Sequence, residues 1–519
     1  MLLGALALRV WGINFGFPAI YRPDEDVVVG RAMGMLHGVL DPQFANWPHL
    51  YLYVSAGWLA LLKPVFPLLG PSAPYFGVRL LDAAIGTVTV LALYRLGRRA
   101  YGEATGLLAA VMLAVAFLAV RDSHFATLDT PLTFACLLGV SAASRLAETG
   151  NRRWGAGAGV LFGLAASIKY NGALVLASVA VAQGLRARNA RRSILGLVVI
   201  TAMGAVAFVV TSPFLVLDLG SFAGGISYIV HHLRTAHQPE IGYLHIPRLA
   251  LWYGLDPPLF LLSLVGVLVA AIRRTRTDLI VLAFVLTYYA VIGAGYSVFV
   301  RYADPLVPPL ALLAARALIV ACARLQPRVV ATTVAAAIVV VPAVAHDLAF
   351  DHLIQQTDTR TQAFDWLERN VPSGARVATL YFAGPAHDQA MIDRRDQSHG
   401  ATDPYVASFL QNRLEVRYTV HGLAESDLNH NDVAVLRADG VDYVVESPVA
   451  PAGGCGPALP LETALKAQTR LRATFSPTHG RCTNAVFDPL DGYYVPLSDY
   501  EGWAYPGPTI RVFELAPVP

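Results

Sequence analysis

The sequence predicts a mostly α-helical, polytopic membrane domain followed by a soluble α/β domain, and three observations predict it. Of the 519 residues 55% are hydrophobic and only 14% are charged, whereas a soluble domain usually has about a quarter of its residues charged. Long apolar segments recur through the first two thirds of the chain. The charge changes sign after His346, because residues 1–346 carry 26 basic and 14 acidic side chains and residues 347–519 carry 13 and 22. We therefore expect a membrane domain over 1–346 and an extracytoplasmic, acidic domain over 347–519.

Nine apolar segments are long enough to be membrane spans. They cover residues 3–20, 75–94, 104–120, 126–147, 194–217, 251–272, 278–297, 303–323 and 327–345. The first could be a signal peptide, but it lacks a basic n-region and carries Arg9 in its middle. We expect it to be a signal anchor that the mature protein retains.

Residues 154–185 form a further apolar stretch that is too long for one span. A straight helix of this length would measure about 48 Å at roughly 1.5 Å per residue, against a hydrocarbon core of roughly 30 Å. The polar insertion Lys169-Tyr170-Asn171-Gly172 therefore predicts a break near its middle.

Arginine clusters set the expected orientation, because cytoplasmic loops are enriched in basic residues. The clusters lie at 95–99, 152–153, 186–192, 273–276 and 324–328. If all are cytoplasmic, the stretch 154–185 is a hairpin of two short helices with Lys169 near the outer face. This arrangement gives about eleven crossings, a cytoplasmic N-terminus and an extracytoplasmic C-terminal domain. The outer loop after the first span contains two helical patterns, 26–40 and 49–69, which we expect at the membrane interface.

Four cysteines are distributed between the two domains. Cys136 and Cys322 lie in apolar segments and are expected to be buried small hydrophobic residues. Cys455 and Cys482 lie in the acidic domain, where a disulfide is plausible if that domain is outside the cytoplasm.

The acidic domain has the pattern of an α/β layer. Helices are expected over 361–370 and 461–467, and strands over 377–382, 441–446 and 509–515. The sequence has neither a glycine-rich nucleotide-binding fingerprint nor a nucleophile elbow. We expect this domain to recruit the acceptor or to cap the membrane domain.

The first group of candidate residues follows the first span, where Asp24, Glu25 and Asp26 are adjacent. A helix start with acidic residues in its first turn explains the residue types. It does not explain three carboxylates beside a bilayer, where burial would raise a carboxyl pKa toward the range of a general base. Asp24 and Glu25 are therefore candidate catalytic residues.

A second polar group lies between the third and fourth spans, in Arg121-Asp122-Ser123-His124 and Asp129-Thr130-Pro131. Asp129 and Pro131 could simply start a helix. Because an unpaired carboxylate at the membrane edge is expensive, we expect Asp129 to have a cationic partner or a metal ion.

Two cations at the outer face are candidates for binding a lipid phosphate. Lys169 is one of three lysines in the chain and could be a snorkelling surface residue, but its place at a helix break suits a point charge for phosphate. Tyr170 and Asn171 are hydrogen-bonding neighbours. Arg301 also lies on the outer side, so a phosphate or Asp304 is its expected partner.

Histidines gather at 231, 232, 237 and 245 around Arg234 and Glu240. A metal site is one interpretation, but this spacing is more typical of a solvated helix face. No zinc-site spacing is present, no cofactor is indicated with certainty, and a divalent cation remains an option because carboxylates are available.

Taken together, these motifs resemble the polyprenyl-phosphate-dependent glycosyltransferases of the GT-C fold. The motifs are Pro23-Asp24-Glu25, residues 121–131, Lys169-Tyr170-Asn171-Gly172, Thr211-Ser212-Pro213-Phe214 and Arg301-Tyr302 with its following prolines. The closest branch includes the protein O-mannosyltransferases and the bacterial aminoarabinose transferases. The resemblance covers residues 1–345 in order.

The resemblance implies roles for individual residues. The catalytic residues would be Asp24, Glu25 and Asp129. Asp24 would be the catalytic carboxylate and Glu25 would orient the acceptor or a cation. Asp129 would be the acidic residue of the second outer loop, with Asp122 left open for that position. Lys169 and Arg301 would bind the donor phosphate. The neighbouring side chains grouped with them as substrate-binding candidates are Tyr170, Tyr302, Arg121 and Asp122.

The expected reaction is transfer of a sugar from a polyprenyl-phosphate donor to an extracytoplasmic hydroxyl, with inversion. The expected partners are that donor, an acceptor protein, lipid or glycan, and membrane lipid, but no nucleic acid. A transporter or flippase is the main alternative, although the halves of the chain show no internal repeat and the ionisable residues lie at one face. A third interpretation of the sequence is a lipid-binding or scaffolding membrane protein that has lost its activity.

Overall fold

The computed structural model divides the chain into two compact units. The first comprises Met1–Ile13, Met35–Lys63 and Tyr75–Leu348, and the second comprises Asn14–Gly34, Pro64–Pro74 and Ala349–Pro519. The structure describes all residues except 18, 71, 188, 236–239, 381–417, 424–432, 448–458, 492 and 516–519. The second unit thus combines the C-terminal domain with two short segments from the N-terminal part of the chain.

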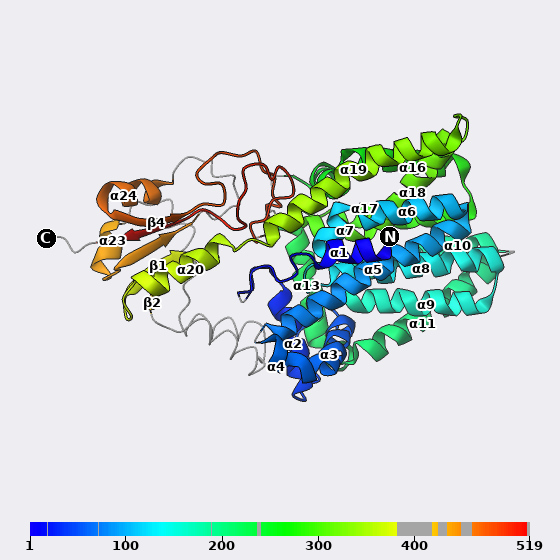
Figure 1. Ribbon diagram of the computed structural model, residues 1–519. Coiled ribbons are helices and arrows are strands. Elements are labelled where there is room, and N and C mark those ends of the chain that lie inside the picture. The colour runs from blue at the N-terminus through cyan, green and yellow to red at the C-terminus, as the bar shows by residue number, and fades with distance from the viewer. Residues whose placement is uncertain are drawn as a thin grey trace. The chain divides into compact units, whose positions relative to one another are not determined.

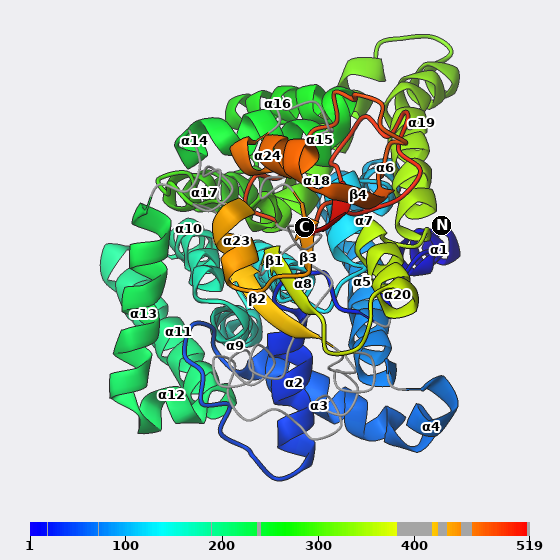
Figure 2. The same ribbon diagram turned by 90° about the vertical axis from the view of Figure 1, so that its left-hand side faces the viewer.

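The first unit is built from helices, with long apolar helices at its centre (Figures 1 and 2). Its earlier elements are α1 (Leu2–Val10), α3 (Leu50–Leu62), α5 (Ala73–Tyr101), α6 (Glu103–Ala114), α7 (Phe117–Asp122), α8 (Asp129–Thr149), α9 (Arg152–Ile168), η2 (Tyr170–Val175), α10 (Leu176–Arg186) and α11 (Ala190–Thr211). Its later elements are α12 (Pro213–Leu217), α13 (Leu219–Arg234), α14 (Gly242–His245), η3 (Ile246–Leu251), α15 (Trp252–Gly254), α16 (Asp256–Arg273), α17 (Arg276–Ile292), η4 (Val300–Leu306), α18 (Val307–Cys322) and α19 (Arg328–Ile354). The end of α19, from Ala349, belongs to the second unit.

The predicted break in 154–185 is confirmed. Helix α9 ends at Ile168, Lys169 has an extended backbone, and the short 3₁₀ turn η2 leads into α10. At the far end of α10, Arg186 Nε donates a hydrogen bond to the carbonyl of Gly150, which lies in the turn before α9 (2.9 Å). The chain therefore returns to the end of the bundle from which α9 started, as a hairpin requires.

The predicted first span is wrong in its length. The sequence indicates a helix over 3–20, but α1 ends at Val10 and turns follow it. Gly12 and Gly16 have φ values of +83° and +76°, a conformation that interrupts a right-handed helix. The buried Arg9 is accommodated because its guanidinium donates to the carbonyl oxygens of Ala5 (2.9 Å) and Ala114 (3.0 Å), the latter at the end of α6.

Seven helical segments among the described residues are long and apolar enough to cross a membrane. They are Leu50–Leu69, Ala73–Tyr101, Asp129–Thr149, Ala190–Thr211, Asp256–Arg273, Val300–Cys322 and Arg328–Asn370. The chain is thus an integral membrane protein. The first of these segments comprises α3, η1 (Lys63–Val65) and α4 (Phe66–Leu69), and the sequence predicts it at the interface. That placement and the count of eleven crossings stay predictions.

The second unit contains a five-stranded mixed sheet in the order β2-β1-β3-β5-β4. The strands are β1 (Arg376–Leu380), β2 (Thr419–Leu423), β3 (Tyr443–Glu446), β4 (Arg470–Phe475) and β5 (Ile510–Glu514). Strands β2, β1 and β3 are parallel, while β5 is antiparallel to both β3 and β4. The predicted α/β layer is confirmed, and β2 and β4 are the strands that the sequence pattern does not indicate.

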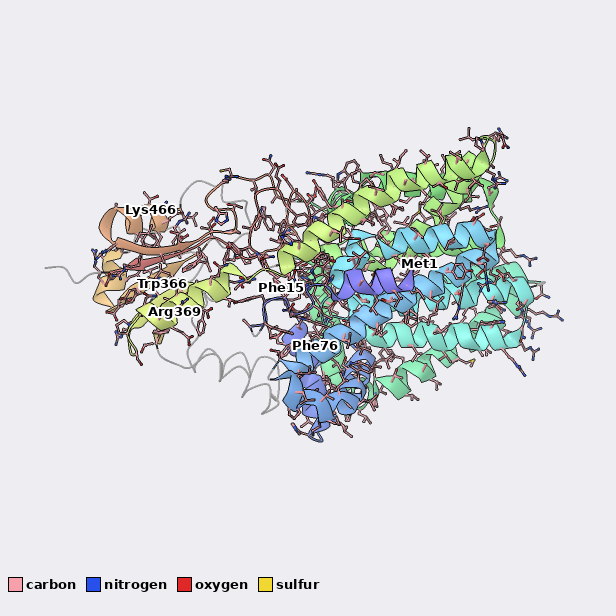
Figure 3. The ribbon with its side chains drawn as sticks, in the orientation of Figure 1. Met1, Phe15, Phe76, Trp366, Arg369 and Lys466 are labelled. Carbon is pink, nitrogen blue, oxygen red and sulfur yellow. The ribbon has the colours of Figure 1, made fainter. Side chains whose placement is uncertain are left out.

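Helices cover both faces of this sheet. Successive strand residues point to opposite faces, so Val377, Val445 and Val512 pack with α20 (Thr359–Asn370). The opposite face packs on α23 (Val433–Ala438) and α24 (Pro460–Gln468) through Ala378, Val444 and Phe513. Figure 3 shows Trp366 and Arg369 on α20 and Lys466 on α24. The second unit also contains α4 and most of α2 (Glu25–Leu36), which begins in the N-terminal segment.

The cysteine predictions have separate outcomes. Cys136 and Cys322 are buried in the first unit, as predicted. Cys455 lies outside the described residues, so the pairing of Cys455 with Cys482 stays a prediction.

Candidate functional site

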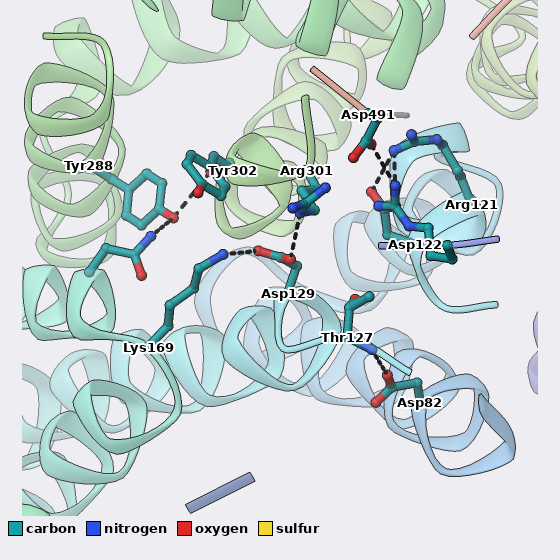
Figure 4. Close-up of polar contacts among 12 residues, drawn as sticks. Asp82, Arg121, Asp122, Thr127, Asp129, Lys169, Tyr288, Arg301, Tyr302 and Asp491 are labelled. Carbon is teal, nitrogen blue, oxygen red and sulfur yellow. Dashed lines mark hydrogen bonds and ion pairs between the residues drawn. The ribbon is translucent and has the colours of Figure 1, made fainter. Parts of the chain in front are cut away.

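The centre of the candidate site is Asp129, the first residue of α8 (Figure 4). Its Oδ1 lies 2.7 Å from Lys169 Nζ, and its Oδ2 lies 3.5 Å from Arg301 Nε. The side chains of Asp129 and Arg301 are 3% and 5% exposed, whereas that of Lys169 is 12% exposed. The expectation that Asp129 has a cationic partner is therefore met twice.

These three residues lie at helix ends or turns that the fold brings together. Helix α8 begins at Asp129, α9 ends one residue before Lys169, and Arg301 lies in η4, the 3₁₀ turn that precedes α18. Helices α8 and α9 pack against each other, so the start of one lies beside the end of the other. The prolines of the Arg301 motif fall in η4 and in the first turn of α18, where proline is tolerated.

Aromatic rings flank the two cations. Lys169 Nζ lies 4.3 Å from the centre of the Tyr302 ring, and the Arg301 guanidinium carbon lies 4.0 Å from the centre of the Phe299 ring. These contacts hold positive charge over π faces and so stabilise both cations at a poorly hydrated position. Tyr302 thus belongs to the site, while Phe299, three residues before it, is a contact that the sequence does not single out.

Two tyrosines and one asparagine form a hydrogen-bonded chain beside the cations (Figure 4). Asn171 Nδ2 donates to the hydroxyl of Tyr288 (2.7 Å), and Tyr288 donates to the backbone carbonyl of Tyr302 (3.2 Å). The hydroxyl of Tyr170 donates a hydrogen bond to the carbonyl of Ala45 (2.7 Å), and the role of Tyr170 as a substrate ligand stays a prediction.

Arg121 and Asp122 form a buried ion pair with each other. Arg121 Nη1 lies 2.9 Å from Asp122 Oδ1 and 3.1 Å from Oδ2. Both residues are at the end of α7, just before the loop that leads to Asp129. This loop is fixed by Asp82 of α5, which accepts a hydrogen bond from the backbone N–H of Thr127 (3.0 Å) and another from the hydroxyl of Tyr51.

One of the two partners expected for Arg301 differs from the observed one. The sequence offers a phosphate or Asp304, but the Arg301 guanidinium pairs with Asp129 and not with Asp304. The phosphate stays a prediction. Asp304 is 3% exposed, and its Oδ1 has no hydrogen-bond partner. The sequence does not indicate Tyr288, whose place beside the cations depends on long-range packing and is seen only in the tertiary structure.

Asp24 and Glu25 belong to the second unit. Asp24 immediately precedes α2 and has a φ of +75°, which is uncommon for a residue other than glycine. Its carbonyl accepts the first hydrogen bond of the helix from Val28 (3.1 Å). The Glu25 side chain is fully buried. The helix-start interpretation is thus correct locally, and the strained backbone is a feature it does not predict.

The residues before Asp24 are held by the C-terminal domain within the same unit. Arg22 forms a buried ion pair with Asp491 (2.7 Å) and lies over the ring of Tyr493 (4.6 Å to its centre). The hydroxyl of Tyr21 lies 2.8 Å from that of Thr361, and the guanidinium of Arg360 covers the Tyr21 ring at 3.8 Å.

The histidine-rich segment holds no metal cluster in the part that the structure describes. His245 Nδ1 lies 3.7 Å from Glu240, and Arg248 pairs with the same carboxylate (2.8 Å). His232 stacks on Tyr228 and on Phe299. His237 lies outside the described residues. No group of three or more His, Cys, Asp or Glu side chains that could hold a metal is found among the described residues.

Part of the chain resembles a known protein family. Residues 46–217 match the model of the family described as dolichyl-phosphate-mannose-protein mannosyltransferase. No curated protein sequence matches the chain.

Two solved structures share its fold. ArnT from Cupriavidus metallidurans in the apo state is 15% identical with a TM-score of 0.51, and the match covers 98% of this chain and 96% of that one. The archaeal oligosaccharyltransferase AglB from Archaeoglobus fulgidus was solved with an inhibitory peptide and a dolichol-phosphate. It is 13% identical with a TM-score of 0.53, and the match covers 86% of this chain and 68% of that one. The predicted GT-C fold is thereby confirmed.

Proposed function

We propose that this chain, a glycosyltransferase of the GT-C fold in the polyprenyl-phosphate-dependent class, moves a sugar from a polyprenyl-phosphate donor to an extracytoplasmic hydroxyl group with inversion. The observation that carries the proposal is the convergence of Lys169 and Arg301 on the buried carboxylate of Asp129. A charge-poor membrane protein retains two cations at one end of its helices, where a lipid-linked phosphate needs them.

The cations would bind the phosphate of the donor. The Lys169 side chain retains some exposure, so its ammonium can contact a ligand while Asp129 still holds it in place. During transfer the phosphate becomes the leaving group, and negative charge grows on its bridging oxygen. Lys169 and Arg301 are positive charges fixed in advance, so they would stabilise that charge without reorganising.

Asp24 would be the general base. In one step the acceptor oxygen forms a bond to the anomeric carbon, its proton passes to the Asp24 carboxylate, and the bond from that carbon to the phosphate oxygen breaks. Polyprenyl phosphate leaves with the electron pair. The left-handed backbone at Asp24 supports this role, since strained conformations cluster at functional sites. Glu25 would orient the acceptor or a cation.

The arginine-rich connections support an extracytoplasmic site. Arg186 and Arg276 bind backbone carbonyls next to the turn between α8 and α9, while Asp129 and Lys169 lie at the other ends of these helices. The positive-inside rule puts the arginine-rich end in the cytoplasm, which leaves Asp129 toward the outer face. The acceptor is a hydroxyl of a protein, lipid or glycan.

The proposal is tested by transfer from a panel of polyprenyl-phosphate sugars, including dolichyl-phosphate mannose, to membrane extracts. We expect the wild-type chain to consume at least one donor, and Asp24→Asn to bind the donor but transfer at least 100-fold more slowly, in the range lost with a general base. Near-wild-type transfer by Asp24→Asn would refute its role. A wild-type chain that consumes no lipid-linked sugar would overturn the proposed reaction and favour transport.

A further inference from the structure

Four polar side-chain atoms around Asp129 are buried without any hydrogen-bond partner. They are Asn171 Oδ1, Asp304 Oδ1, Thr127 Oγ1 and Thr133 Oγ1. Thr127 precedes Asp129 by two residues, Thr133 follows it by one helical turn, and Asp304 follows Arg301 by three residues. Buried polar groups in folded proteins are nearly always hydrogen-bonded, so several orphans at one place indicate a polar ligand.

The orientation of Asn171 makes its orphan atom an acceptor. The Tyr302 carbonyl can only accept, so the single proton of the Tyr288 hydroxyl is used there. The oxygen of that hydroxyl must then accept, and the group that faces it on Asn171 is the amide nitrogen (2.7 Å). The amide oxygen of Asn171 is therefore turned away from Tyr288 and left to accept a hydrogen bond from something else.

Asp304 supplies a second acceptor in the same neighbourhood. Its carboxyl group interacts electrostatically with Asp122, Asp129, Arg121 and Lys169, and with Tyr288. Among the described residues it forms neither a side-chain hydrogen bond nor an ion pair. Asp304 is nine-tenths or more buried and lies in the 3₁₀ turn that carries Arg301 and Tyr302. The turn thus brings a cation for a phosphate and an unsatisfied carboxyl group to the same site.

The chemistry of these atoms selects between the parts of a lipid-linked sugar. A phosphodiester and an isoprenoid chain have no protons to donate, so neither can satisfy Asn171 Oδ1. Sugar hydroxyl groups both donate and accept, so they can satisfy amide oxygens, carboxyl groups and threonine hydroxyls. We propose that Asn171 and Asp304 bind hydroxyl groups of the transferred sugar, beside the cations that bind its phosphate. This inference rests on the proposed function and adds a sugar subsite to it.

Such a subsite makes the site selective for a hydroxylated sugar. Where a buried acceptor is built to receive a substrate hydroxyl, an analogue without that hydroxyl leaves the acceptor unpaired and is rejected strongly. We therefore expect deletion of a single hydroxyl to weaken donor binding by about tenfold or more at one or two positions of the ring.

The test measures how much the sugar adds to the affinity for the lipid phosphate. Dolichyl phosphate and dolichyl-phosphate mannose, with its single-deoxy analogues, would be titrated into the full-length chain in nanodiscs, so that binding is measured without transfer. Asp304→Leu and Asp304→Asn form a matched pair, because both keep the side-chain size and only Asn keeps hydrogen-bonding atoms. Asn171→Leu is a second, independent variant.

We expect all variants to bind dolichyl phosphate as the wild type does, which also shows that they are folded. The factor by which mannose raises the affinity over dolichyl phosphate should fall at least tenfold in Asp304→Leu and in Asn171→Leu. Each of these variants should bind one of the deoxy analogues as tightly as dolichyl-phosphate mannose itself. Asp304→Asn should stay within a few-fold of the wild type.

Two results would overturn the inference. One is an affinity increment from mannose that is unchanged in both leucine variants, and the other is a wild type to which no sugar of the donor panel adds affinity. Neither depends on turnover. A chain that binds the sugar through Asp304 but transfers nothing would instead contradict the proposed reaction.

Discussion

At the scale of single residues, the Asp129 carboxylate is the shared partner of two cations, Lys169 and Arg301. Its carboxylate lies 2.7 Å from Lys169 and 3.5 Å from Arg301, with all three side chains largely buried. Buried charges without partners are costly, so the carboxylate stabilises both cations. This explains why residues with opposite charges, which look like separate exceptions in the sequence, occur together.

Replacing Lys169 by Met keeps the length of the side chain and removes its charge. A hydrogen bond to a charged group is worth about 1.5–3 kcal/mol, so the donor KM should rise roughly 10- to 100-fold. The donor KM of Lys169→Arg should lie between those of the wild type and Lys169→Met, since the charge is kept but the geometry of the side chain differs. Donor saturation curves measure this effect. Equal donor KM values for Lys169→Met and the wild type would exclude Lys169 from phosphate binding.

At the scale of elements, the site depends on the sharp turn between α9 and α10. The turn η2 packs so closely over the end of α9 that a Cβ atom at Gly172 would overlap the carbonyl of Ala165. Glycine is therefore required at this position for close backbone approach. The neighbouring Lys169 and Asn171 owe their placement to the same turn.

Gly172→Ala should destabilise the chain by about 1–3 kcal/mol, the usual cost of forcing extra atoms into a packed position. Gly184→Ala on α10 is the matched control, because no atom lies within 4 Å of its added Cβ. The control should be neutral or slightly stabilising, since alanine favours helix over glycine by about 0.5–1 kcal/mol. Apparent Tm values in detergent compare the two variants. Equal Tm values would show that the turn tolerates a side chain.

At the scale of the whole molecule, the segment that carries Asp24 is part of the unit that contains the C-terminal domain. The buried ion pair between Arg22 and Asp491 joins this segment to the C-terminal domain, across more than 450 residues of sequence. Removing one member of a buried ion pair is costly because the other charge stays behind. The C-terminal domain therefore fixes the residues just before the proposed base, which is a role distinct from the predicted recruitment or capping.

Asp491→Ala should lower kcat at least tenfold and leave the donor KM nearly unchanged, because it displaces the segment of Asp24 and leaves the phosphate cations intact. Arg472→Ala is the control, since its ion pair with Glu514 is partly exposed and such pairs contribute about 0–1 kcal/mol. Hydrogen exchange over residues 14–34 should increase only in Asp491→Ala. A rise in donor KM without a change in kcat would contradict this role.

Much of the architecture could be predicted from the sequence. Hydropathy reports how many apolar residues follow one another, so it identified the membrane class, the long helices and the broken stretch at Lys169. Sequence patterns likewise indicate three of the strands and the helices α20 and α24 of the C-terminal domain, but not α23. Asp129, Lys169 and Arg301 were identifiable because a charge at the edge of an apolar segment requires a reason.

The partners of those charges were decided by tertiary structure alone. Arg301 pairs with Asp129, which lies 172 residues away in sequence, rather than with the nearby Asp304. The early end of α1, the attachment of Arg22 to Asp491 and the unsatisfied oxygens of Asn171 and Asp304 are equally non-local. Local composition determines whether a segment prefers lipid or water and where it can bend. Which polar groups meet, and which stay unsatisfied for a ligand, depends on the packing of distant helices.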